Sequence, residues 1–265
     1  MAAIVTLCTD FGTADSYVAA MKGVILTIAP QATLVDISHD VARHSVAEAA
    51  FVLRSAFDCF PPGTVHLVIV DPGVGSARRG IAVRCGNHRF VAPDNGVLSY
   101  VLGGPEPFEA VALTQSAYWR AEVSHTFHGR DVFAPVAAHL ANGVPLSALG
   151  PPVTDPVRLD LATPSVREDG LIVGQVIHVD HFGNLVTNIP ASALSRGQPR
   201  SISVGQVTIA GLAAGPAVCA TTYSSVCVGQ LLALVGSHGY LEIAVREGSA
   251  AHAACVGIGA QVLVE

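Results

Sequence analysis

The sequence predicts an α/β N-terminal domain with a central, mostly parallel sheet, followed by a smaller all-β, barrel-like C-terminal domain. Apolar strands alternate with helix-patterned segments up to residue 70. Prolines then interrupt the chain at Pro151, Pro152, Pro156 and Pro164. Short strands separated by Gly and Ser turns follow to the C-terminus. We therefore expect domains at residues 1–155 and 170–265, joined by a linker at residues 156–169.

The first domain is expected to alternate strands with helices. The predicted strands are residues 3–8, 32–37 and 64–70, and the predicted helices are residues 17–28 and 45–57. This order favours parallel pairing through right-handed crossovers. Two further strands, at residues 80–84 and 89–92, are expected to form a hairpin around Gly86-Asn87, and a helix is expected at residues 131–141.

The second domain is expected to consist of short strands. The predicted strands are residues 171–179, 185–189, 201–204, 207–209, 231–235, 240–245 and 261–264. Their close spacing predicts a small β-barrel or sandwich.

The composition limits the partners of the protein. Charged residues make up only 13% of the 265 residues, and the net charge is −6. A negative chain without a basic cluster is a poor nucleic-acid binder. Such a low charged fraction predicts apolar surface buried between subunits. No apolar run reaches the roughly 18 residues of a membrane span.

The N-terminus and the cysteines point to the cytoplasm. The chain begins Met-Ala-Ala-Ile-Val-Thr-Leu-Cys, which lacks the basic start and long apolar core of a signal peptide. The six cysteines are far apart and form no C-x-x-C motif. We expect a cytoplasmic protein with reduced thiols.

Four aspartates lie at or just past the ends of predicted strands, namely Asp10, Asp36, Asp71 and Asp94. Exits of parallel strands share one sheet edge, where α/β proteins bind their ligands. Aspartate at such positions also caps helices and forms turns, so we expect two of the four to face a ligand.

The stretch from Val68 to Arg79 is the most marked of these exits. A β-branched run ends in Asp71, two glycines turn the chain, and Arg78 follows seven residues later. A carboxylate and a guanidinium on one tight loop can be held near a common point. Taken alone, the pair is better explained as a structural turn, since loops rich in Gly and Pro are common.

Other motifs exclude several classes of site. Gly86-Asn87-His88 is faintly similar to a metallophosphoesterase motif, but Arg89 stands where an acidic residue should follow. The chain has no partner for His128 at helical spacing, no Gly-x-Ser-x-Gly elbow and no P-loop. We therefore expect no metal site.

Two stretches of the second domain combine unusual side chains, at residues 180–190 and 236–251. The first offers a carboxylate, an aromatic face and an amide, which suit an amine and an adenine-like ring. The second places a strand between Gly-Ser turns whose backbone amides can meet a carboxylate. Ordinary hairpins explain both stretches equally well.

Seven stretches in order together resemble the S-adenosylmethionine (SAM) hydroxide adenosyltransferases, relatives of the fluorinases and chlorinases. The stretches are residues 9–23, 36–39, 70–75, 92–96, 126–131, 182–189 and 236–251. The resemblance implies hydrolysis of SAM to adenosine and L-methionine by SN2 attack of water or hydroxide at C5′. It also implies an α/β domain followed by a β-barrel, and a homotrimer with active sites between subunits. SAM is the substrate, and no cofactor is implied.

The resemblance implies a catalytic set at Asp71, Arg78 and His128. Halogenating relatives lack this set. Fluorinases also have a halide-contacting serine where this chain has Gly129, and a tryptophan where it has His44. These differences favour water over halide.

Substrate contacts are implied for further residues. Asp10 matches the aspartate that holds the ribose hydroxyls, and Asp180 matches the carboxylate near the methionine amine. Ser237 and His238 match the methionine-contacting pair, although relatives commonly have arginine in place of His238.

The adenine contacts are implied for the second domain. Asn184 matches an adenine-binding amide, Phe182 and Tyr223 match stacking faces, and the backbone near Glu247 matches the group that reads the adenine edge. A halogenase of the same fold and a non-catalytic SAM- or adenosine-binding protein remain as alternatives.

Overall fold

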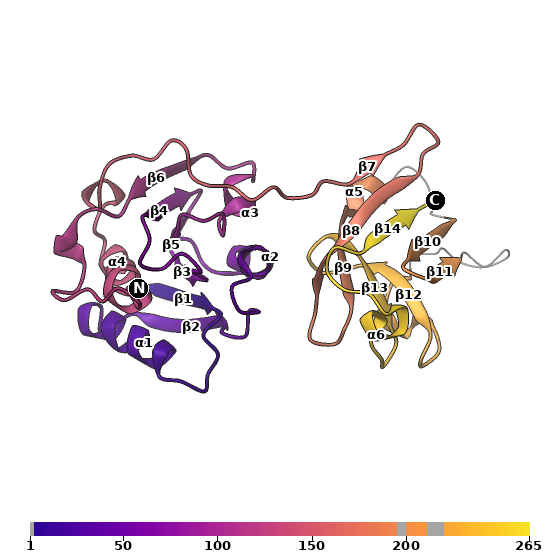
Figure 1. The fold of residues 1–265 in the computed structure, drawn as a ribbon, viewed down its shortest axis with the longest axis horizontal. Coiled ribbons are helices and arrows are strands. Elements are labelled where there is room, and N and C mark those ends of the chain that lie inside the picture. Colours follow the sequence, from indigo (N-terminus) through magenta and orange to yellow (C-terminus); the bar gives the residue numbers. More distant parts are fainter. Residues whose placement is uncertain (1–2, 195–199, 211–219) are drawn as a thin grey trace. The chain divides into compact units, whose positions relative to one another are not determined.

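The computed structural model describes residues 3–194, 200–210 and 220–265. The chain forms two compact units, Met1–Asp160 and Leu161–Glu265. Figure 1 shows helices around a sheet in the first unit and mainly strands in the second. Each unit has its own hydrophobic core.

The first unit is built on a six-stranded sheet. In spatial order its strands are β2 (Thr33–Ser38), β1 (Ile4–Thr9), β3 (Val65–Ile69), β5 (His88–Pro93), β4 (Gly80–Cys85) and β6 (Phe108–Ala112). The first four strands are parallel, whereas β4 is antiparallel to both of its neighbours. The sheet is therefore mixed, and the prediction of a mostly parallel sheet is correct only for the β2–β1–β3–β5 part. The physical reason is the predicted turn at Gly86-Asn87, since so short a connection joins only antiparallel strands.

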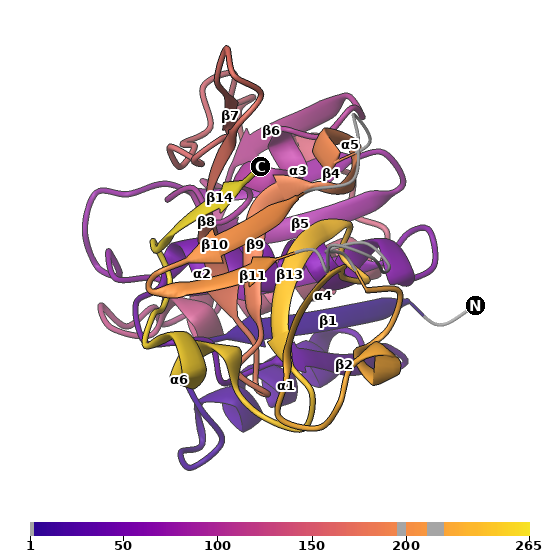
Figure 2. The same ribbon diagram turned by 90° about the vertical axis from the view of Figure 1, so that its right-hand side faces the viewer.

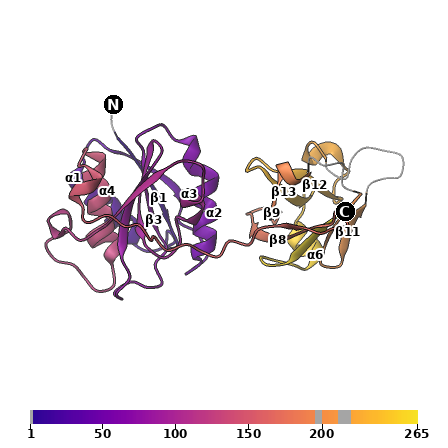
Figure 3. The same cartoon turned by 90° about the horizontal axis from the view of Figure 1, so that it is seen from above.

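Helices cover both faces of this sheet. Figure 3 shows α1 (Tyr17–Ile28) and α4 (Ala134–Ala141) on one face, and α2 (Val46–Ala56) and α3 (Ser99–Leu102) on the other. Alternate residues of β3 pack into two apolar clusters of the first unit. Leu67 packs in the cluster that contains Met21 of α1, and Val68 packs in the cluster that contains Leu53 of α2. Burial on both faces explains the unbroken apolar runs of the central strands.

Several short elements were not predicted from the sequence pattern. They are α3, β6, β7 (Ser165–Val166), α5 (Ala191–Leu194), α6 (Ala250–Ala254), and the 3-10 turns η1 (Phe57–Cys59), η2 (Ser116–Tyr118), η4 (Leu146–Ala148) and η5 (Tyr223–Ser225). The helix expected at residues 131–141 begins as a π-helix, η3 (Gly129–Phe133), and continues as α4. Among the described residues, no helix has both the length and the apolar character needed to cross a membrane.

The second unit is an antiparallel, barrel-like sheet. Its strands follow the order β11 (Val207–Ala210), β10 (Ser201–Val204), β14 (Gln261–Val264), β8 (Ile172–Val179), β9 (Leu185–Pro190), β13 (Tyr240–Val245) and β12 (Leu231–Val235), with β7 paired to β8. The terminal strands β11 and β12 also contact each other, which nearly closes the sheet. Figure 2 faces this unit and shows β10 and β14 beside β8.

Candidate functional site

The ends of two neighbouring parallel strands place Asp10 and Asp71 at one edge of the first sheet. Thr9 of β1 is in register with Ile69 of β3. Asp10 follows Thr9 directly, and Asp71 lies two residues beyond Ile69. The carboxyl ends of parallel strands are the usual ligand-binding edge of an α/β sheet.

Arg78 joins Asp71 and His128 into one cluster. Its Nε donates to Asp71 Oδ1 at 3.0 Å, and its Nη2 donates to Asp71 Oδ2 in a second, short bond. The same Nη2 lies 3.1 Å from His128 Nδ1. The Asp71 and Arg78 side chains are only 6% and 14% exposed, so water screens the pair weakly. Phe133 of the π-helix packs against the guanidinium, with Cζ 5.0 Å from the ring centre.

The hydrogen bond from Arg78 determines which nitrogen of His128 carries the proton. Arginine has only donors, so His128 Nδ1 must accept, and the neutral ring carries its proton on Nε2. Arg78 uses Nε and Nη2 on Asp71 and His128, whereas its Nη1 has no hydrogen-bond partner among the described residues. Arg78 Nη1 and His128 Nε2 therefore remain as donors for an oxygen atom held at the cluster.

The surroundings of His128 keep its ring neutral. Burial lowers the pKa of His128, and the nearby Arg78 charge lowers it further, while Asp71 and Asp131 act in the opposite direction. Protonation would place the second hydrogen of the ring on Nδ1, directly against the Arg78 donor. The hydrogen bond between Arg78 and His128 therefore requires the neutral ring.

A buried carboxylate fixes the loop that contains His128. Asp131 is 0% exposed and accepts hydrogen bonds from the Arg120 side chain, the Arg130 side chain and the Ser124 backbone. Burial alone would raise the pKa of Asp131, but these hydrogen bonds hold it well below its usual range. The backbone N–H of Arg120 also donates to the Asp131 carbonyl, which closes the loop of residues 120–131.

Glycines allow the two loops of the cluster to pack closely. Gly75 has φ of +78°, and a Cβ there would lie 2.5 Å from the His125 carbonyl oxygen. A Cβ at Gly129 would lie 3.3 Å from both Met21 Sδ and Phe127. The Asp71–Arg78 loop therefore rests against the His128 loop at a position open only to glycine.

Asp10 anchors a different loop at the same sheet edge. Its Oδ2 accepts the backbone N–H of His44 at 2.8 Å, and His44 has the left-handed φ of 65°. Gly12 also has a positive φ and donates its N–H to the His39 carbonyl. These contacts hold the residue 10–12 and 39–44 segments together beside Asp10.

The other two strand-end aspartates have partners within the protein. Asp36 lies 2.6 Å from Lys22 Nζ and 3.0 Å from His39 Nε2. The side chain of Asp94 is 1% exposed, accepts from Arg79 Nε at 2.8 Å and accepts the backbone N–H of Val157. Asp94 therefore connects Arg79 to a residue near the end of the first unit.

The second unit has a cavity of about 540 Å³ that brings five predicted residues together. It is lined by Asp180, Phe182, Asn184, Tyr223, Val245, Arg246, Glu247, Gly248 and Ser249. Phe182 is 73% exposed, so its ring is available as a stacking surface. Glu247 has φ of 56°, an unusual backbone conformation for a residue with a side chain.

Asp180 organises the first loop of this cavity. Its Oδ1 accepts the backbone N–H groups of Phe182 and Asn184, and its Oδ2 accepts from Asn184 Nδ2 at 2.8 Å. At Gly183, with φ of +82°, a Cβ would overlap Ser249 Oγ at 2.1 Å. The loop therefore packs against residue 249 and fixes the amide of Asn184, which is 6% exposed.

Ser237 and His238 do not line the cavity but lie on the neighbouring β12–β13 turn. The Tyr223 hydroxyl donates to Glu242 Oε1 at 2.6 Å, and His238 Nε2 lies 3.3 Å from Glu242 Oε2. Burial and the Glu242 carboxylate both raise the pKa of Tyr223. Glu242 thus connects a cavity residue to the predicted methionine-contacting pair, while Ser237 is exposed.

Asp131 and Glu242 are the main residues of these sites that sequence reasoning missed. Asp131 lies inside the quoted motif of residues 126–131, yet the motif gives no sign that this carboxylate is buried. Glu242 is the one acidic residue of β13, whose other central residues are buried and apolar. A single charge inside an apolar strand is the signal that could have identified it.

No metal centre is evident in residues 3–194, 200–210 and 220–265, where no group of three or more His, Cys, Asp or Glu side chains is placed to hold a metal ion. The five described cysteines, Cys8, Cys59, Cys85, Cys227 and Cys255, are free thiols. Cys219 lies outside the described residues.

Known proteins resemble the chain along nearly its full length. An (R)-S-adenosyl-L-methionine hydrolase of Salinispora arenicola is 42% identical over 98% of this chain and 97% of that protein. The hydrolase of the same name from Thermus thermophilus is 37% identical over 92% of each chain. A conserved protein from Thermotoga maritima has a crystal structure with a TM-score of 0.89 and 37% identity, covering 98% of this chain and 99% of that chain.

The fluorinases are more distant relatives. A fluorinase of Nocardia brasiliensis is 28% identical over 99% of this chain and 96% of that protein. The N-terminal domain model of the SAM hydroxide adenosyltransferases matches residues 5–150, and the C-terminal domain model matches residues 174–263. The chain therefore belongs to the SAM hydroxide adenosyltransferase family.

Proposed function

We propose that this protein is an enzyme that hydrolyses SAM to adenosine and L-methionine. Water or hydroxide attacks C5′ of the adenosyl group, the C5′–S bond breaks as the thioether of methionine leaves, and the proton lost by an attacking water passes to solvent. The observation that best supports the proposal is the Arg78 guanidinium, held by Asp71 and bound to neutral His128. The named activity of the 42% identical relative is the same reaction class.

The chemistry makes the nucleophile the difficult part. Methionine leaves a sulfonium centre as a neutral thioether, so no acid is needed to protonate the leaving group. Hydroxide is scarce at neutral pH, and a site must stabilise it as it forms. Arg78 Nη1 and His128 Nε2 are two donors suited to a water oxygen, and the permanent Arg78 charge favours its hydroxide form.

Asp71 acts in this scheme by holding the guanidinium. Two hydrogen bonds fix the plane of Arg78, so its unused Nη1 has a defined direction. Positioning and electrostatic stabilisation of this kind lower barriers by several kcal/mol in enzymes. The scheme requires no redox cofactor, because no electrons are transferred, and it requires no metal, because Arg78 and His128 stabilise the nucleophile.

The substrate contacts divide between the two units. Asp10, at the same sheet edge as Asp71, binds the ribose hydroxyls in our proposal. Adenine occupies the cavity of the second unit, with Phe182 and Tyr223 as ring contacts and Asn184 as a hydrogen-bonding partner. The backbone near Glu247 reads the edge of the base.

The methionine half of SAM is assigned to three residues of the second unit. Asp180 lies near the amine, and Ser237 and His238 meet the carboxylate. Both Asp180 oxygens already accept hydrogen bonds from its own loop, so an amine would share them. We infer a homotrimer in which the N-terminal unit of one subunit and the C-terminal unit of the next complete each site.

We place the enzyme in the cytoplasm. The five described cysteines are free, as expected of a protein in a reducing compartment. SAM is the only small-molecule partner in the proposal, and we propose no nucleic-acid or membrane partner.

Product analysis tests the function directly. Purified protein is incubated with SAM, and the products are separated by chromatography. We expect adenosine and methionine in equal amounts, formed at a rate proportional to enzyme concentration. SAM binding without turnover would instead identify a binding protein.

A halogenase of the same fold is the nearest rival. A Cβ at Gly129 would lie 3.3 Å from both Met21 and Phe127, so a serine there would require these neighbours to shift by a few tenths of an ångström, which argues against a serine-lined halide site. Adding chloride or fluoride to the same reaction decides the matter. Formation of 5′-halo-5′-deoxyadenosine would support the halogenase, and adenosine alone supports the hydrolase.

A further inference from the structure

A second cavity in the first unit lies away from the residues assigned to SAM. It has a volume of about 520 Å³, within the usual range for small-molecule sites. Pro62 and His88, which line it, lie at the starts of β3 and β5, whereas Asp71 follows the end of β3. At about 3.3 Å per residue, the length of β3 separates this cavity from the Asp71 edge by roughly 16 Å.

A buried polar chain leads from the sheet interior to this cavity. Thr6 and His66 are both 0% exposed, and Thr6 Oγ1 lies 2.8 Å from His66 Nδ1. His66 Nε2 in turn lies 3.2 Å from Nδ1 of His88, which lines the cavity. Burial lowers the pKa of His66 to about 3, so its ring is neutral near pH 7. Polar groups are costly at such positions, where β-branched side chains usually pack.

The hydrogen bonds from Thr6 through His66 to His88 leave one ring nitrogen of His88 for a ligand. Among the described residues, His88 has a hydrogen-bond partner only at Nδ1. The Thr6 hydroxyl can donate or accept, so the two imidazoles can exchange tautomers without losing either hydrogen bond. His88 Nε2 can therefore present either a donor or a lone pair to the cavity.

Aromatic rings hold both histidines in place. Phe57 contacts the His88 ring edge-on at 5.7 Å between centres, and Phe60 contacts the His66 ring at the same distance. Phe57 and Phe60 also line the cavity. A flat apolar group entering it would meet ring surfaces on this side.

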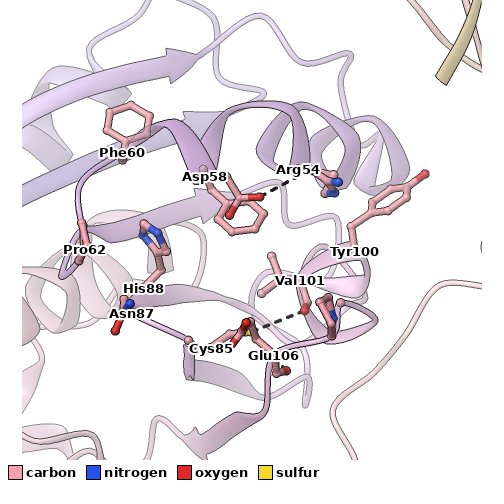
Figure 4. A pocket seen from close by; sticks show the side chains of 14 residues that line it. Arg54, Asp58, Phe60, Pro62, Cys85, Asn87, His88, Tyr100, Val101 and Glu106 are labelled. Atoms are coloured by element: carbon pink, nitrogen blue, oxygen red, sulfur yellow. Dashed lines mark hydrogen bonds and ion pairs between the residues drawn. The ribbon is translucent and has the colours of Figure 1, made fainter. Parts of the chain in front are cut away.

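The charges around the cavity favour a cation. Figure 4 shows Asp58 and Glu106 on opposite sides of the space, one from η1 and one from the loop after α3. Arg54 lies 3.9 Å from Asp58 and offsets that carboxylate. Burial lowers the pKa of His88, although Asp58 opposes the effect, so the ring adds no charge near neutral pH. Two carboxylates, Asp58 and Glu106, and one cation, Arg54, therefore line the cavity, which leaves one negative charge without a partner among the lining residues.

We propose that this cavity binds a small organic amine that has an aromatic ring, with its ammonium group between Asp58 and Glu106 and its ring against Phe57 and His88. The site is separate from the SAM site, and the proposal does not depend on SAM hydrolysis. An anion of the same shape is disfavoured by both carboxylates. A neutral ring without the amine loses the charge interaction but keeps the ring contacts.

Phenethylamine and phenylacetate are suitable probes, since they share a ring and differ in the sign of their charge. Binding to the full-length protein is followed at low salt by the imidazole ¹H–¹⁵N resonances of His66 and His88, assigned by His66→Gln and His88→Gln variants. We expect phenethylamine to shift the His88 signals saturably and phenylacetate to leave them unchanged. Adenosine added at saturation should not displace the amine, because it occupies the other site.

Glu106→Gln provides the decisive variant, because it removes one charge and keeps the side-chain shape. We expect it to weaken phenethylamine binding about three- to fivefold, the effect of one partly exposed ion pair. Glu109→Gln is the matched control, since Glu109 is exposed, pairs with Arg84 and does not line the cavity. Equal binding of both probes, an unchanged affinity in Glu106→Gln, or no His88 shift at millimolar amine would each overturn the proposal.

Discussion

At the scale of single residues, the cluster depends on how Arg78 divides its donors. Nε and Nη2 hold Asp71 and His128, which leaves Nη1 for the nucleophile. A lysine has one nitrogen and cannot reproduce this planar arrangement. The charge alone is therefore insufficient, and the geometry of the guanidinium is required.

Arg78→Lys is expected to lower kcat by about 10²- to 10³-fold, a loss comparable to removing one oxyanion donor. SAM affinity should change less than threefold, because the proposed role of Arg78 is directed at the nucleophile. Steady-state kinetics and equilibrium SAM binding separate the two effects. Arg84→Lys, in an exposed pair with Glu109, is the control and should leave both unchanged. An equal loss in kcat and in affinity would contradict this role.

Asp131 acts on His128 through charge and through the loop. Among the charged groups near His128, Asp71 and Asp131 raise its pKa, while Arg78 and His125 lower it. Asp131→Asn removes one raising influence, so the acid-side fall of kcat, which reflects protonation of His128, should move to lower pH. The measurement is the kcat–pH profile, with Asp155→Asn as a control at an exposed pair. A uniformly lower kcat with an unmoved acid limb would mean that Asp131 is only structural.

At the scale of elements, two loops must pack together before the cluster exists. The loop after β3 supplies Asp71 and Arg78, and the loop before the π-helix supplies His128. Gly75 lies where these loops touch, with its Cα facing the His125 carbonyl. Close approach of two backbones is the reason for glycine at this position.

Gly75→Ala should separate these loops. Its Cβ would lie 2.5 Å from the His125 carbonyl oxygen, and its φ of +78° is strained for alanine. We expect a loss of stability of about 1–3 kcal/mol and a fall in kcat of at least tenfold. Gly63→Ala is the control, because it also has a positive φ but has open space around its Cβ position. Equal effects on kcat from both variants would show that loop contact is irrelevant.

The sequence pattern predicted those elements that have a strong period and missed those that depend on packing. Residues 17–28 form a helix with the predicted ends, and the strands at 201–204, 231–235, 240–245 and 261–264 also match. The π-helix at Gly129–Phe133 was not predictable, because it follows the same apolar pattern as an α-helix. The edge strand β6 was missed although Phe108–Ala112 includes buried apolar residues.

Site prediction shows the same limit. Asp10 and Asp71 were expected at one sheet edge, and the β1–β3 register places them there. Asp94 is buried, pairs with Arg79 and accepts the backbone N–H of Val157, and no local pattern reveals a contact with a residue 63 positions along the chain. The roles of the individual residues stay predictions until variants are measured.

At the scale of the whole molecule, one buried group links stability to pH. The pKa of His66 is lowered by burial from 6.5 to about 3 in the folded protein. Between these values the unfolded chain binds a proton that the folded protein does not. The free energy of unfolding therefore decreases as pH falls below about 6.5, with a slope approaching 1.4 kcal/mol per pH unit, an order-of-magnitude figure.

His66→Gln should flatten this dependence, because glutamine does not titrate. Chemical unfolding between pH 4.5 and pH 7 gives the slope of the unfolding free energy against pH for each protein. We expect this slope to be smaller in the variant by on the order of 1 kcal/mol per pH unit. His252→Gln, at an exposed position of α6, should behave like the unchanged protein. Parallel pH profiles for all three proteins would show that His66 does not carry this dependence.

The most direct test of the central claim is hydrolysis of SAM in H₂¹⁸O, followed by mass spectrometry of the products. Attack of water at C5′ predicts one ¹⁸O atom in the 5′-hydroxyl of adenosine and none in methionine. Arg78→Lys should give the same labelling at a much lower rate. Absence of adenosine from active-site-intact protein, or adenosine without the label, would contradict the account.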